Sequence, residues 1–271
     1  MSEQDSSVIS SLQNQRVKDI VRLRQRSHRD DSAKVIIEGT REIQMALNNG
    51  VNPDEIYFCN DFIDSEADQQ VIEQCRAHGA QLYECTKSVL EKIAYRDQPQ
   101  GLLAIAPAIS KQLQSFSPPT ECLIVIAEAI EKPGNLGAIL RTCDAAGVDA
   151  VILCDKCTDI NNPNVIRAST GTVFSVPVFE ATSQETIEWL EEHSVKTISA
   201  TPSGNKIYSE INMTGPTAVV VGAEKPGLSE LWLSKTDDLA VIPMKGQADS
   251  LNVSQATTIL LYEALRQRSD H

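Results

Sequence analysis

Residues 122–142 read CLIVIAEAIEKPGNLGAILRT. The apolar run Leu123–Ala127 has the length and composition of a strand that is buried on both faces. The residues from 136 to 146 show the apolar spacing of a helix, and Pro133 stands just before them, where its missing N–H costs nothing. A buried strand that leads through a short loop into a helix is the repeating unit of a parallel sheet. This stretch therefore predicts an α/β fold.

The same alternation continues toward the carboxyl terminus. The expected strands are Ala150–Leu153, Val176–Phe179, Thr197–Ala200, Ala218–Val221 and Leu239–Ile242. The expected helices that come after Leu136–Ala146 are Gln184–His193, Leu228–Leu233 and Leu251–Gln267. Because several of these strands are continuous apolar runs, we expect helices to cover both faces of a mostly parallel sheet.

The first hundred residues form a second, shorter alternating pattern. Its expected strands are Lys34–Glu38, Glu55–Cys59, Gln81–Cys85 and Leu102–Ala106. Its expected helices are a basic one near residues 16–29, then Thr40–Asn49, Glu66–His78 and Ser88–Tyr95. This pattern predicts a smaller α/β unit whose sheet is also mostly parallel. Polar residues around Pro118-Pro119 indicate a linker. We therefore expect a domain at 1–108, a linker at 109–120 and a larger domain at 121–271.

The composition excludes several classes of protein. Of the 271 residues, 41% are hydrophobic, which is enough for a sizeable core. No apolar run approaches the ~18 residues of a membrane span, and Met1–Ser7 is polar, without the pattern of a signal peptide. We therefore expect a cytoplasmic protein with no membrane partner. Aromatic residues make up only 4%, which argues against a surface that holds single-stranded nucleic acid chiefly by base stacking.

The charge is acidic overall and basic locally. The chain has 24 Lys and Arg against 37 Asp and Glu, a net charge of −13, which repels nucleic acid on average. Six cations nevertheless lie between Arg16 and Arg29, interrupted by one acid, Asp19. If this segment is one helix, Arg22, Arg26 and Arg29 share a face and form a candidate RNA-binding patch. From charge alone, a solvated helix face fits equally well.

Seven cysteines in a chain without an export signal predict reduced thiols. Cys154 and Cys157 have the spacing of redox and zinc motifs. A zinc site needs further ligands, and no second cysteine pair or His is close in sequence. A thioredoxin-like pair stands where a helix begins, whereas this pair follows the strand that ends at Leu153. We expect ordinary thiols at a strand end and no metal, with a redox protein as a third hypothesis for the function.

Common nucleotide and hydrolase signatures are absent from the sequence. No Gly-x-Gly-x-x-Gly follows the first strand of either unit and no Gly-Lys-Ser/Thr occurs, which disfavours a Rossmann dinucleotide site and a Walker phosphate loop. No His-Glu-x-x-His or Gly-x-Ser-x-Gly occurs, so the sequence lacks the motifs of metal hydrolases and serine hydrolases. Other segments must therefore carry the chemistry.

The first candidate segment is EKPGNLGAILRT, residues 131–142. Asn135 is expected to cap the helix that follows. One face of that helix carries small residues followed by one arginine, and consists of Gly134, Gly137, Ala138 and Arg141. A bare face permits close approach of a ligand or of another backbone, and the Arg can bind a phosphate in a fork. Tight helix packing with an exposed Arg explains the segment as well when it is taken alone.

Two further segments carry polar residues at the ends of expected strands. In TAVVVGAEKPGLSELW, Gly222 ends a buried strand and Glu224 lies before a helix, at the edge where open α/β sheets bind ligands. In AVIPMKGQADSLNVSQATTILLYEAL, Ser250 precedes a long helix and Asn252 stands in its first turn. Helix capping and compensation of the helix dipole explain each segment by itself.

In this order and at these spacings, the three segments resemble the motifs of the SpoU (TrmH-like) family of RNA ribose 2′-O-methyltransferases, which belongs to the knotted SPOUT class. The resemblance rests on three residue sets, which are Asn135 with Arg141, Gly222 with Glu224, and Ser250-Leu251-Asn252. It covers about residues 120–268. The first hundred residues resemble the amino-terminal substrate-binding domain of the family, of ribosomal-protein L30e type.

The resemblance implies a fold and a cofactor. The carboxyl-terminal half is expected to form a deep trefoil knot, in which the last helix threads through a preceding loop, a rare exception to the rule against threading. S-adenosylmethionine is expected to bind in the knot loops, held largely by backbone groups. Position by position, its contacts fall near Thr201, Gly222, Ile242, Pro243 and Leu251. Members usually work as homodimers through this domain, with the site completed near the interface.

The resemblance also implies a reaction. A ribose 2′-hydroxyl attacks the methyl carbon of a sulfonium, so catalysis must position the hydroxyl and stabilise charge on its oxygen. We expect Arg141 to bind that oxygen and the adjacent phosphate, because a guanidinium resists deprotonation and is a poor base. Asn135 is expected to orient the substrate or Arg141, and Glu224 to fix a neighbouring donor such as Arg141. Ser250 and Asn252 are expected to shape the pocket.

The amino-terminal unit indicates a structured RNA target. By analogy, large-subunit (23S) ribosomal RNA is the expected substrate, and transfer RNA is the alternative. A non-catalytic RNA-binding protein of the same fold is a hypothesis from another class. The intact motif residues disfavour it, and a lack of cofactor binding would favour it.

Overall fold

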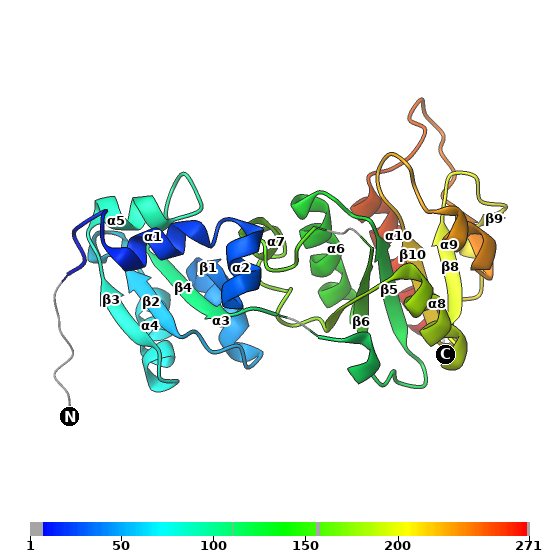
Figure 1. Cartoon of the computed structure of the whole chain (residues 1–271). Coiled ribbons are helices and arrows are strands. Elements are labelled where there is room, and N and C mark those ends of the chain that lie inside the picture. Colours follow the sequence, from blue (N-terminus) through cyan, green and yellow to red (C-terminus); the bar gives the residue numbers. More distant parts are fainter. Residues whose placement is uncertain (1–7, 110, 156–157, 270–271) are drawn as a thin grey trace. The chain divides into compact units, whose positions relative to one another are not determined.

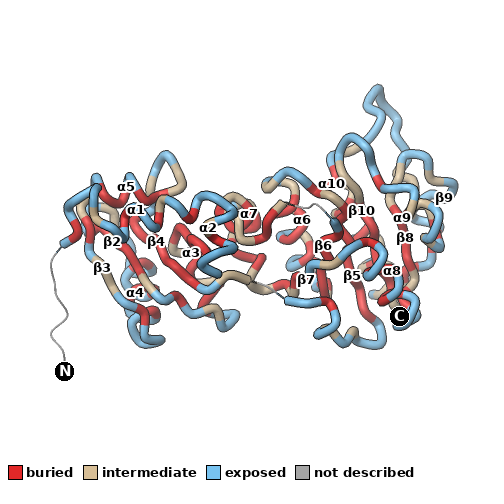
Figure 2. The backbone as a smooth tube through the Cα atoms, in the orientation of Figure 1, coloured by how far each residue is buried: buried red, intermediate tan, exposed pale blue. Residues whose placement is uncertain are grey.

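The computed structural model describes residues 8–109, 111–155 and 158–269. The chain folds as two compact units. The first contains the residues up to Ile109 together with Asp159–Ser175, and the second contains the rest of the described chain (Figure 1). In each unit, the strands form a buried sheet that helices cover (Figure 2).

Within the described residues, the first unit is built on a four-stranded sheet. Its strands are β1 (Lys34–Glu38), β2 (Glu55–Phe58), β3 (Gln81–Glu84) and β4 (Leu102–Pro107). They lie in the order β1-β4-β2-β3. β4 runs antiparallel to both β1 and β2, whereas β2 and β3 are parallel. The prediction of a mostly parallel sheet is wrong for this unit, because its last strand inserts between the first two and the alternation of elements does not fix strand direction.

Helices cover both faces of this sheet. They are α1 (Gln15–Arg22), α2 (Arg26–Ser32), α3 (Thr40–Asn48), α4 (Glu66–Ala77), α5 (Lys87–Ile93) and α7 (Pro163–Ala168), with a 3-10 turn η1 (Asn60–Phe62). α1 and α5 pack on one face, where Val17, Leu90 and Tyr57 belong to one buried cluster. α3 and α4 lie on the other face (Figure 1), and α7 packs against β1.

The basic segment forms two short helices, so the prediction of one continuous helix is wrong. α1 ends at Arg22 and α2 begins at Arg26, and both side chains are more than half exposed. Arg29 is only 3% exposed and therefore does not belong to an RNA-binding surface. Its guanidinium binds the Asp159 carboxylate, with Nη2 and Nε at 2.5 and 3.0 Å from Oδ2. Its Nη1 also donates to two main-chain carbonyl oxygens just after α1, at 2.8 and 2.9 Å.

Replacing Arg29 with alanine is expected to lower the free energy of unfolding by about 3–5 kcal/mol, because the buried Asp159 carboxylate then lacks its partner. Urea unfolding followed by circular dichroism measures this change. Arg26→Ala is the matched control. Its ion pair with Asp30 is exposed on both sides and 3.5 Å long, so its loss is expected to cost less than about 1 kcal/mol. Equal effects of the two substitutions would contradict the buried role of Arg29.

Among the described residues, the second unit contains a seven-stranded sheet in which every pairing is parallel. Its strands are β5 (Leu123–Glu128), β6 (Ala150–Cys154), β7 (Val178–Ala181), β8 (Lys196–Ala200), β9 (Lys206–Ile207), β10 (Thr217–Val221) and β11 (Asp238–Val241). They lie in the order β7-β6-β5-β10-β8-β11-β9. The prediction of a parallel sheet is confirmed for this unit, where apolar runs fill the buried middle strands.

Helices also cover both faces of the second sheet. They are α6 (Pro133–Ala146), α8 (Ser183–Glu192), α9 (Glu230–Lys235) and α10 (Val253–Ser269), with 3-10 turns η2 (Leu113–Ser115) and η3 (Tyr208–Glu210). Trp189 of α8 and Trp232 of α9 join a cluster with the inward side chains of β5, β6 and β10. α6 and α10 pack against each other on the opposite face (Figure 1). None of the helices in the described chain has the length and hydropathy of a membrane span.

Two segments pack differently from the expected domain division. Residues 111–120, expected in a linker, contribute Leu113 to the core of the second unit, and Phe116 stacks on Phe179 with ring centroids 5.0 Å apart. Residues 159–175, expected in the larger domain, belong to the first unit. Both segments pack against residues that lie far away in the sequence, and local composition does not reveal such contacts.

Candidate active site

Three loops leave the same edge of the second sheet. Thr201 follows β8, Gly222 follows β10 and Ile242 follows β11. β8 lies between β10 and β11, and the three strands run in the same direction. The loops therefore begin side by side at the carboxyl edge of the sheet, which is where open parallel sheets bind ligands.

The loop after β8 packs its backbone against β11, and the loop after β10 packs its backbone against itself. The Thr201 N–H donates to the carbonyl oxygen of Ala240 at 3.0 Å. A Cβ added to Gly222 would lie 2.6 Å from the carbonyl carbon and oxygen of Gly227, closer than real Cβ atoms come. Ala223 and Gly227 pair across this turn as an isolated bridge. The turn therefore has no room for a side chain at Gly222, where only main-chain atoms stand.

The three sequence motifs meet in one polar cluster. The Glu224 carboxylate accepts hydrogen bonds from Asn135 Nδ2 and from the ammonium of Lys132. Asn135 Oδ1 accepts from Asn252 Nδ2 at 3.2 Å. Asn252 Oδ1 in turn accepts from the backbone N–H and the hydroxyl of Ser254, at 3.0 and 2.7 Å. Side chains from three segments that lie far apart in sequence are thereby joined in one hydrogen-bonded chain.

Asn135 enters this cluster from the first turn of α6. The helix begins at Pro133, with Lys132 in the capping position and no hydrogen bond from a capping side chain. The prediction that Asn135 caps the helix is therefore wrong. Pro133 moves the start upstream because its fixed φ suits the first helical position. The Asn135 amide consequently bonds side chains of the two other motifs instead of the helix end.

Arg141 lies exposed on α6, about two turns after the start of the helix. No hydrogen bond or ion pair joins its guanidinium to another described residue. Glu224 binds neighbouring donors, as expected, but these are the Asn135 amide and the Lys132 ammonium instead of Arg141. Thr142 Oγ1 lies 3.2 Å from Thr258 Oγ1, so this part of α6 lies beside α10. The Arg141 fork is therefore available for a bidentate contact with an anion such as a phosphate.

The remaining candidate residues lie along the same loops. Thr201, Ile242 and Leu251 are partly buried, whereas Pro243 and Ser250 are exposed. Ile242 and Pro243 open the loop that follows β11, and Ser250 and Leu251 close it, shortly before α10. The loops thus bring apolar side chains and main-chain groups together, a combination that small-molecule sites commonly use.

Sequence reasoning missed Lys132. It belongs to the first of two copies of Glu-Lys-Pro-Gly, at 131–134, and Glu224 belongs to the second, at 224–227. The ion pair between them joins the two copies. Lys132 is 69% exposed, so the pair adds little stability and its effect is to orient the Glu224 carboxylate. The repeated string before two helices was the signal that could have indicated this contact.

A buried carboxylate anchors the far end of the loop that starts at Gly222. Glu128 ends β5 and is 5% exposed. It accepts from the Ser229 N–H at 2.8 Å, at the start of α9, where a negative charge complements the helix dipole. Ser183 Oγ lies 3.4 Å from the other carboxylate oxygen of Glu128, donates to Asp155 Oδ2 at 2.5 Å and accepts from the indole N–H of Trp232 at 2.8 Å. The loop is thus held at one end by β10 and at the other by Glu128.

The cysteine pair has only one described member. Cys154 is buried in β6, with its Sγ 3.2 Å from Thr186 Oγ1, and Cys157 lies outside the described residues. Within residues 8–109, 111–155 and 158–269, no group of three or more His, Cys, Asp or Glu side chains is arranged to hold a metal. The role of the pair stays a prediction.

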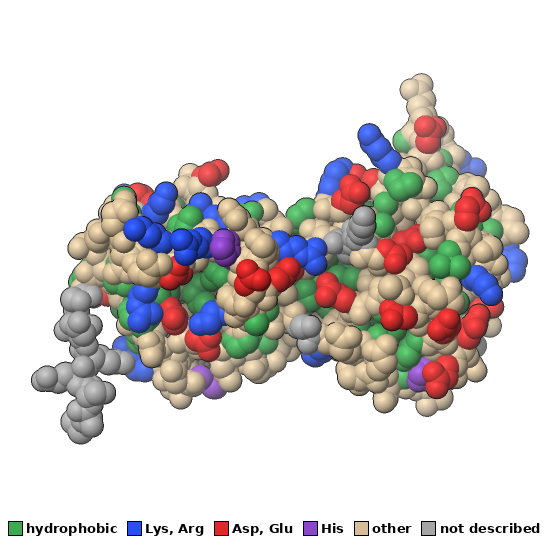
Figure 3. Space-filling view, in the orientation of Figure 1, with side chains coloured by type: hydrophobic (Ala, Val, Ile, Leu, Met, Phe, Trp, Pro, Cys, Tyr) green, Lys and Arg blue, Asp and Glu red, His purple; other side chains and the backbone are tan. Residues whose placement is uncertain are grey.

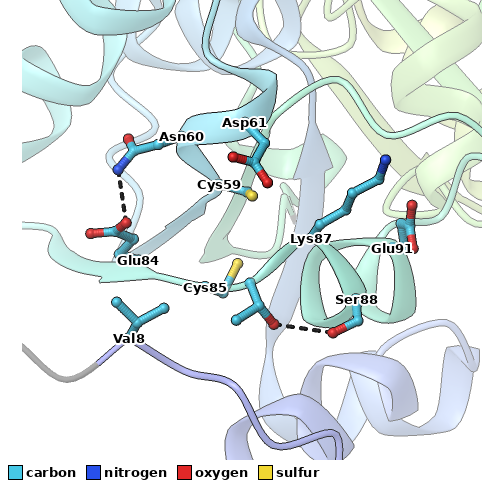
Figure 4. Close-up of a pocket in the computed structure, with 10 residues that line it drawn as sticks. Val8, Cys59, Asn60, Asp61, Glu84, Cys85, Lys87, Ser88 and Glu91 are labelled. Atoms are coloured by element: carbon cyan, nitrogen blue, oxygen red, sulfur yellow. Dashed lines mark hydrogen bonds between the residues drawn. The ribbon is translucent and has the colours of Figure 1, made fainter.

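A pocket of about 530 Å³ lies in the first unit, beside α5 and the ends of β2 and β3 (Figure 4). Cys59 and Cys85 line it, and burial raises the pKa of the Cys85 thiol to about 12, so this thiol is unreactive at neutral pH. Its charged lining residues are Asp61, Glu84, Lys87 and Glu91. An acidic rim repels nucleic acid, and none of the three motifs contributes to it. This pocket is therefore not the candidate active site.

Residues 122–262 match the sequence profile described as the SpoU rRNA Methylase family, which is more than half of the chain. The chain belongs to this family. Residues 14–104 of the same SpoU family member match the MRM3-like substrate binding domain. The resemblance seen in the three motifs is thereby confirmed, as is an α/β fold with a smaller amino-terminal domain.

Relatives of this SpoU family member align with both of its units. The 23S rRNA (guanosine(2553)-2′-O)-methyltransferase RlmP of Bacillus subtilis is 30% identical over 254 residues, which cover 94% of this chain and 97% of the relative. A crystal structure of an RNA 2′-O ribose methyltransferase is 41% identical, with a TM-score of 0.86 over 97% of this chain and 100% of its own. The AdoMet-bound rRNA methyltransferase of Sinorhizobium meliloti is 32% identical, with a TM-score of 0.88 over 96% and 97%.

Proposed function

We propose that this SpoU family member transfers the methyl group of S-adenosylmethionine to a ribose 2′-hydroxyl of 23S ribosomal RNA. One observation carries the proposal. Asn135, Glu224 and Asn252, one from each motif, form a single hydrogen-bonded cluster near the carboxyl edge of the parallel sheet. The relatives support the substrate, because RlmP is named for 2′-O-methylation of 23S rRNA and aligns with almost the whole chain.

The three loops at this edge fit S-adenosylmethionine. The tight turn at Gly222 would offer main-chain groups to the cofactor, and Ile242 and Leu251 would offer apolar surface. The proposed cofactor contacts are Thr201, Gly222, Ile242, Pro243 and Leu251. When bound, the cofactor supplies a methyl group activated by a positively charged sulfur. The trefoil knot expected for these loops is part of the same proposal.

The side chains around the cofactor site have distinct proposed roles. Arg141 binds the phosphate next to the reacting ribose and stabilises negative charge on the 2′-oxygen as its proton leaves to phosphate or water. The cluster of Asn135, Glu224 and Asn252 holds the ribose in place, and Lys132 keeps the Glu224 carboxylate oriented. Ser250 shapes the entrance from the loop before α10.

We propose that the protein works as a homodimer through its carboxyl-terminal unit. Tyr262, on α10, is 50% exposed, although it is a large and mostly apolar side chain. A second copy that covers this face of α10 would lie close to α6, which carries Arg141. Sedimentation velocity tests the proposal, because the particle is expected to have the mass of two chains.

Replacing Glu128 with alanine is expected to raise the KM for S-adenosylmethionine about tenfold and to leave kcat within about twofold. The reason is that the Ser229 N–H loses its acceptor, so the loop after β10 is no longer held at that end. Glu128→Gln, which keeps an oxygen acceptor, is expected to restore most of the affinity. Steady-state kinetics at saturating RNA measures both constants.

The control for Glu128 is Glu185→Ala. Glu185 accepts from the Thr182 N–H and hydroxyl in the capping box of α8, away from the loop after β10. Both substitutions lower stability, and only Glu128→Ala is expected to change the KM. An unchanged KM in Glu128→Ala would show that this carboxylate only stabilises the fold.

The proposed function is tested by methyl transfer from radiolabelled S-adenosylmethionine to unmodified transcripts of 23S rRNA, 16S rRNA and tRNA. Label is expected in 23S rRNA alone and at a nucleotide whose 3′ phosphodiester resists alkali, because a methylated 2′-oxygen cannot attack it. Label in tRNA alone would favour the alternative substrate. Absence of cofactor binding in calorimetry would favour a non-catalytic RNA-binding protein.

A further inference from the structure

The loop after β8 crosses over a strand of its own sheet. β11 lies between β8 and β9, and the three strands run in the same direction. Ala240 of β11 pairs on one side with Ala200, which ends β8, and on the other with Lys206, which begins β9. Because β11 continues into its own loop at Ile242, residues 201–205 must pass over one face of β11. We call residues 201–205 the crossover.

Gly204 is the point where the crossover lies against the backbone of β11. A Cβ added to Gly204 would lie 2.7 Å from the carbonyl carbon of Ala240 and 2.8 Å from the Leu239 carbonyl oxygen, closer than real Cβ atoms come. Both atoms belong to the main chain, so they cannot move aside as the end of a flexible side chain can. Gly204 does not have a positive φ, so only this close contact excludes a side chain.

Hydrogen bonds hold both ends of the crossover on β11. The Thr201 N–H donates to the Ala240 carbonyl oxygen at 3.0 Å. The Asn205 N–H donates to the Leu239 carbonyl oxygen at 3.2 Å. Within the crossover, the Gly204 N–H donates to the Thr201 carbonyl oxygen at 3.1 Å. The place of Thr201, a proposed cofactor contact, is thus set by β11 as well as by its own strand.

A buried carboxylate connects the two strands that the crossover joins. Asp238, at the start of β11, is 6% exposed. It accepts from the ammonium of Lys196 in β8 at 2.7 Å and from that of Lys206 in β9. Burial alone would raise the pKa of Asp238, but the hydrogen bonds from the two ammonium groups outweigh burial and hold this pKa below its ordinary value. The ionised carboxylate therefore ties β9, and with it the far end of the crossover, to β11.

We propose that Gly204 and Lys206 are positioning residues for S-adenosylmethionine. Gly204 lets the crossover lie against β11, and Lys206 holds its far end through Asp238, so that Thr201 meets the cofactor at a fixed place. In this role neither residue touches the cofactor, and both act through the main chain of the crossover. The inference rests on the proposed function, which places the cofactor at Thr201.

Gly204→Ala is expected to weaken the binding of S-adenosylmethionine by about 30-fold or more in calorimetry without RNA, because the added methyl group lifts the crossover off β11. In the protein without cofactor, amide hydrogen exchange is expected to become faster in peptides that cover residues 201–207 and to stay unchanged in β5. Gly215→Ala, where nothing lies within 4 Å of the added Cβ, is the control and is expected to match the wild type in both measurements.

Two lysines that bind the same carboxylate separate positioning from stability. Lys206→Ala is expected to weaken cofactor binding about fivefold, and Lys206→Arg to restore it. Lys196→Ala removes the same charge at the start of β8, away from the crossover, and is expected to change the affinity less than about twofold. Lys196 is 35% exposed against 55% for Lys206, and it also donates to the Asn212 carbonyl oxygen at 3.0 Å. A role in stability alone therefore predicts the opposite order.

Both lysines lie at the surface, so these substitutions are expected to leave the fold intact. Figure 3 shows Lys and Arg side chains among Asp and Glu side chains over the part of the second unit that holds β8 and β9. Circular dichroism checks the fold of each variant. In steady-state methyl transfer, Gly204→Ala and Lys206→Ala are expected to raise the KM for S-adenosylmethionine and to leave kcat within about twofold.

The proposal would be overturned if Gly204→Ala bound the cofactor within threefold of the wild type, or if exchange became faster throughout the second unit. Equal losses of affinity in the two lysine variants would also overturn it, since they would show a general effect on stability. If Gly204→Ala does not fold, the lysine pair decides the question. A wild type that binds no S-adenosylmethionine would refute the proposed function itself, whereas normal binding by the wild type and by both positioning variants would refute this inference alone.

Discussion

Arg141→Ala is expected to reduce methyl transfer by about 10³-fold and to leave S-adenosylmethionine binding within twofold of the wild type. Removing a single group that stabilises a developing oxyanion costs about 10²–10³-fold in kcat, and the loss of the phosphate contact adds to this. Cofactor affinity is spared because the proposed cofactor contacts lie on the three loops and not on α6. Stability is spared because the guanidinium is exposed and bonds no other described residue.

Arg141→Lys is expected to reduce methyl transfer nearly as much as Arg141→Ala. An ammonium keeps the charge and loses the planar fork that binds a phosphate in two places. Lys235→Ala, which removes an exposed cation from the last turn of α9, is the control and is expected to retain full activity. Rapid-quench methyl transfer at saturating RNA and calorimetry with S-adenosylmethionine measure the two effects. Wild-type transfer by Arg141→Ala would refute the role assigned to this residue.

Gly222→Ala is expected to weaken S-adenosylmethionine binding by at least 100-fold. The added methyl group would lie 2.6 Å from the main chain of Gly227 and 2.7 Å from the Leu228 nitrogen, and a backbone cannot give way as a flexible side chain can. The loop after β10 must therefore open, which displaces the main-chain groups proposed to hold the cofactor. Calorimetry measures the affinity, and circular dichroism checks that the sheet is retained.

Gly215→Ala is the matched control for Gly222. Gly215 lies just before β10, at the opposite end of the same strand, and nothing lies within 4 Å of its added Cβ. The Gly215→Ala variant is expected to bind S-adenosylmethionine with the affinity of the wild type. If Gly222→Ala also bound within twofold of the wild type, the loop after β10 would not be part of the cofactor site.

The sequence was sufficient for the parts of the fold that depend on local pattern. β5 and β10 are continuous apolar runs, and such runs occur where helices cover both faces of a parallel sheet. Asn135, Glu224 and Asn252 were recognised because their three segments together match a family, and they bond to one another in the structure. The roles of these residues in catalysis stay predictions.

The rest depends on contacts between distant segments. The direction of β4 follows from its insertion between β1 and β2, which no periodicity encodes. Arg29 has the charge of its exposed neighbours, and only the Asp159 carboxylate, 130 residues away, explains why it is buried. Lys132 was overlooked because a solvated lysine before a helix needs no partner, and its ion pair with Glu224 exists only once the two loops meet.

Because residues 159–175 belong to the first unit, one cut in the chain cannot separate the two units. The polypeptide passes between the units three times, near residues 110, 158 and 176. A fragment that stops at Ile109 lacks α7, which packs on β1, and it lacks the carboxylate that neutralises Arg29 inside the fold. Chimaeras that exchange the amino-terminal half with that of a relative must therefore also exchange residues 159–175. A single junction would leave the core of the first unit without the segment that packs against it.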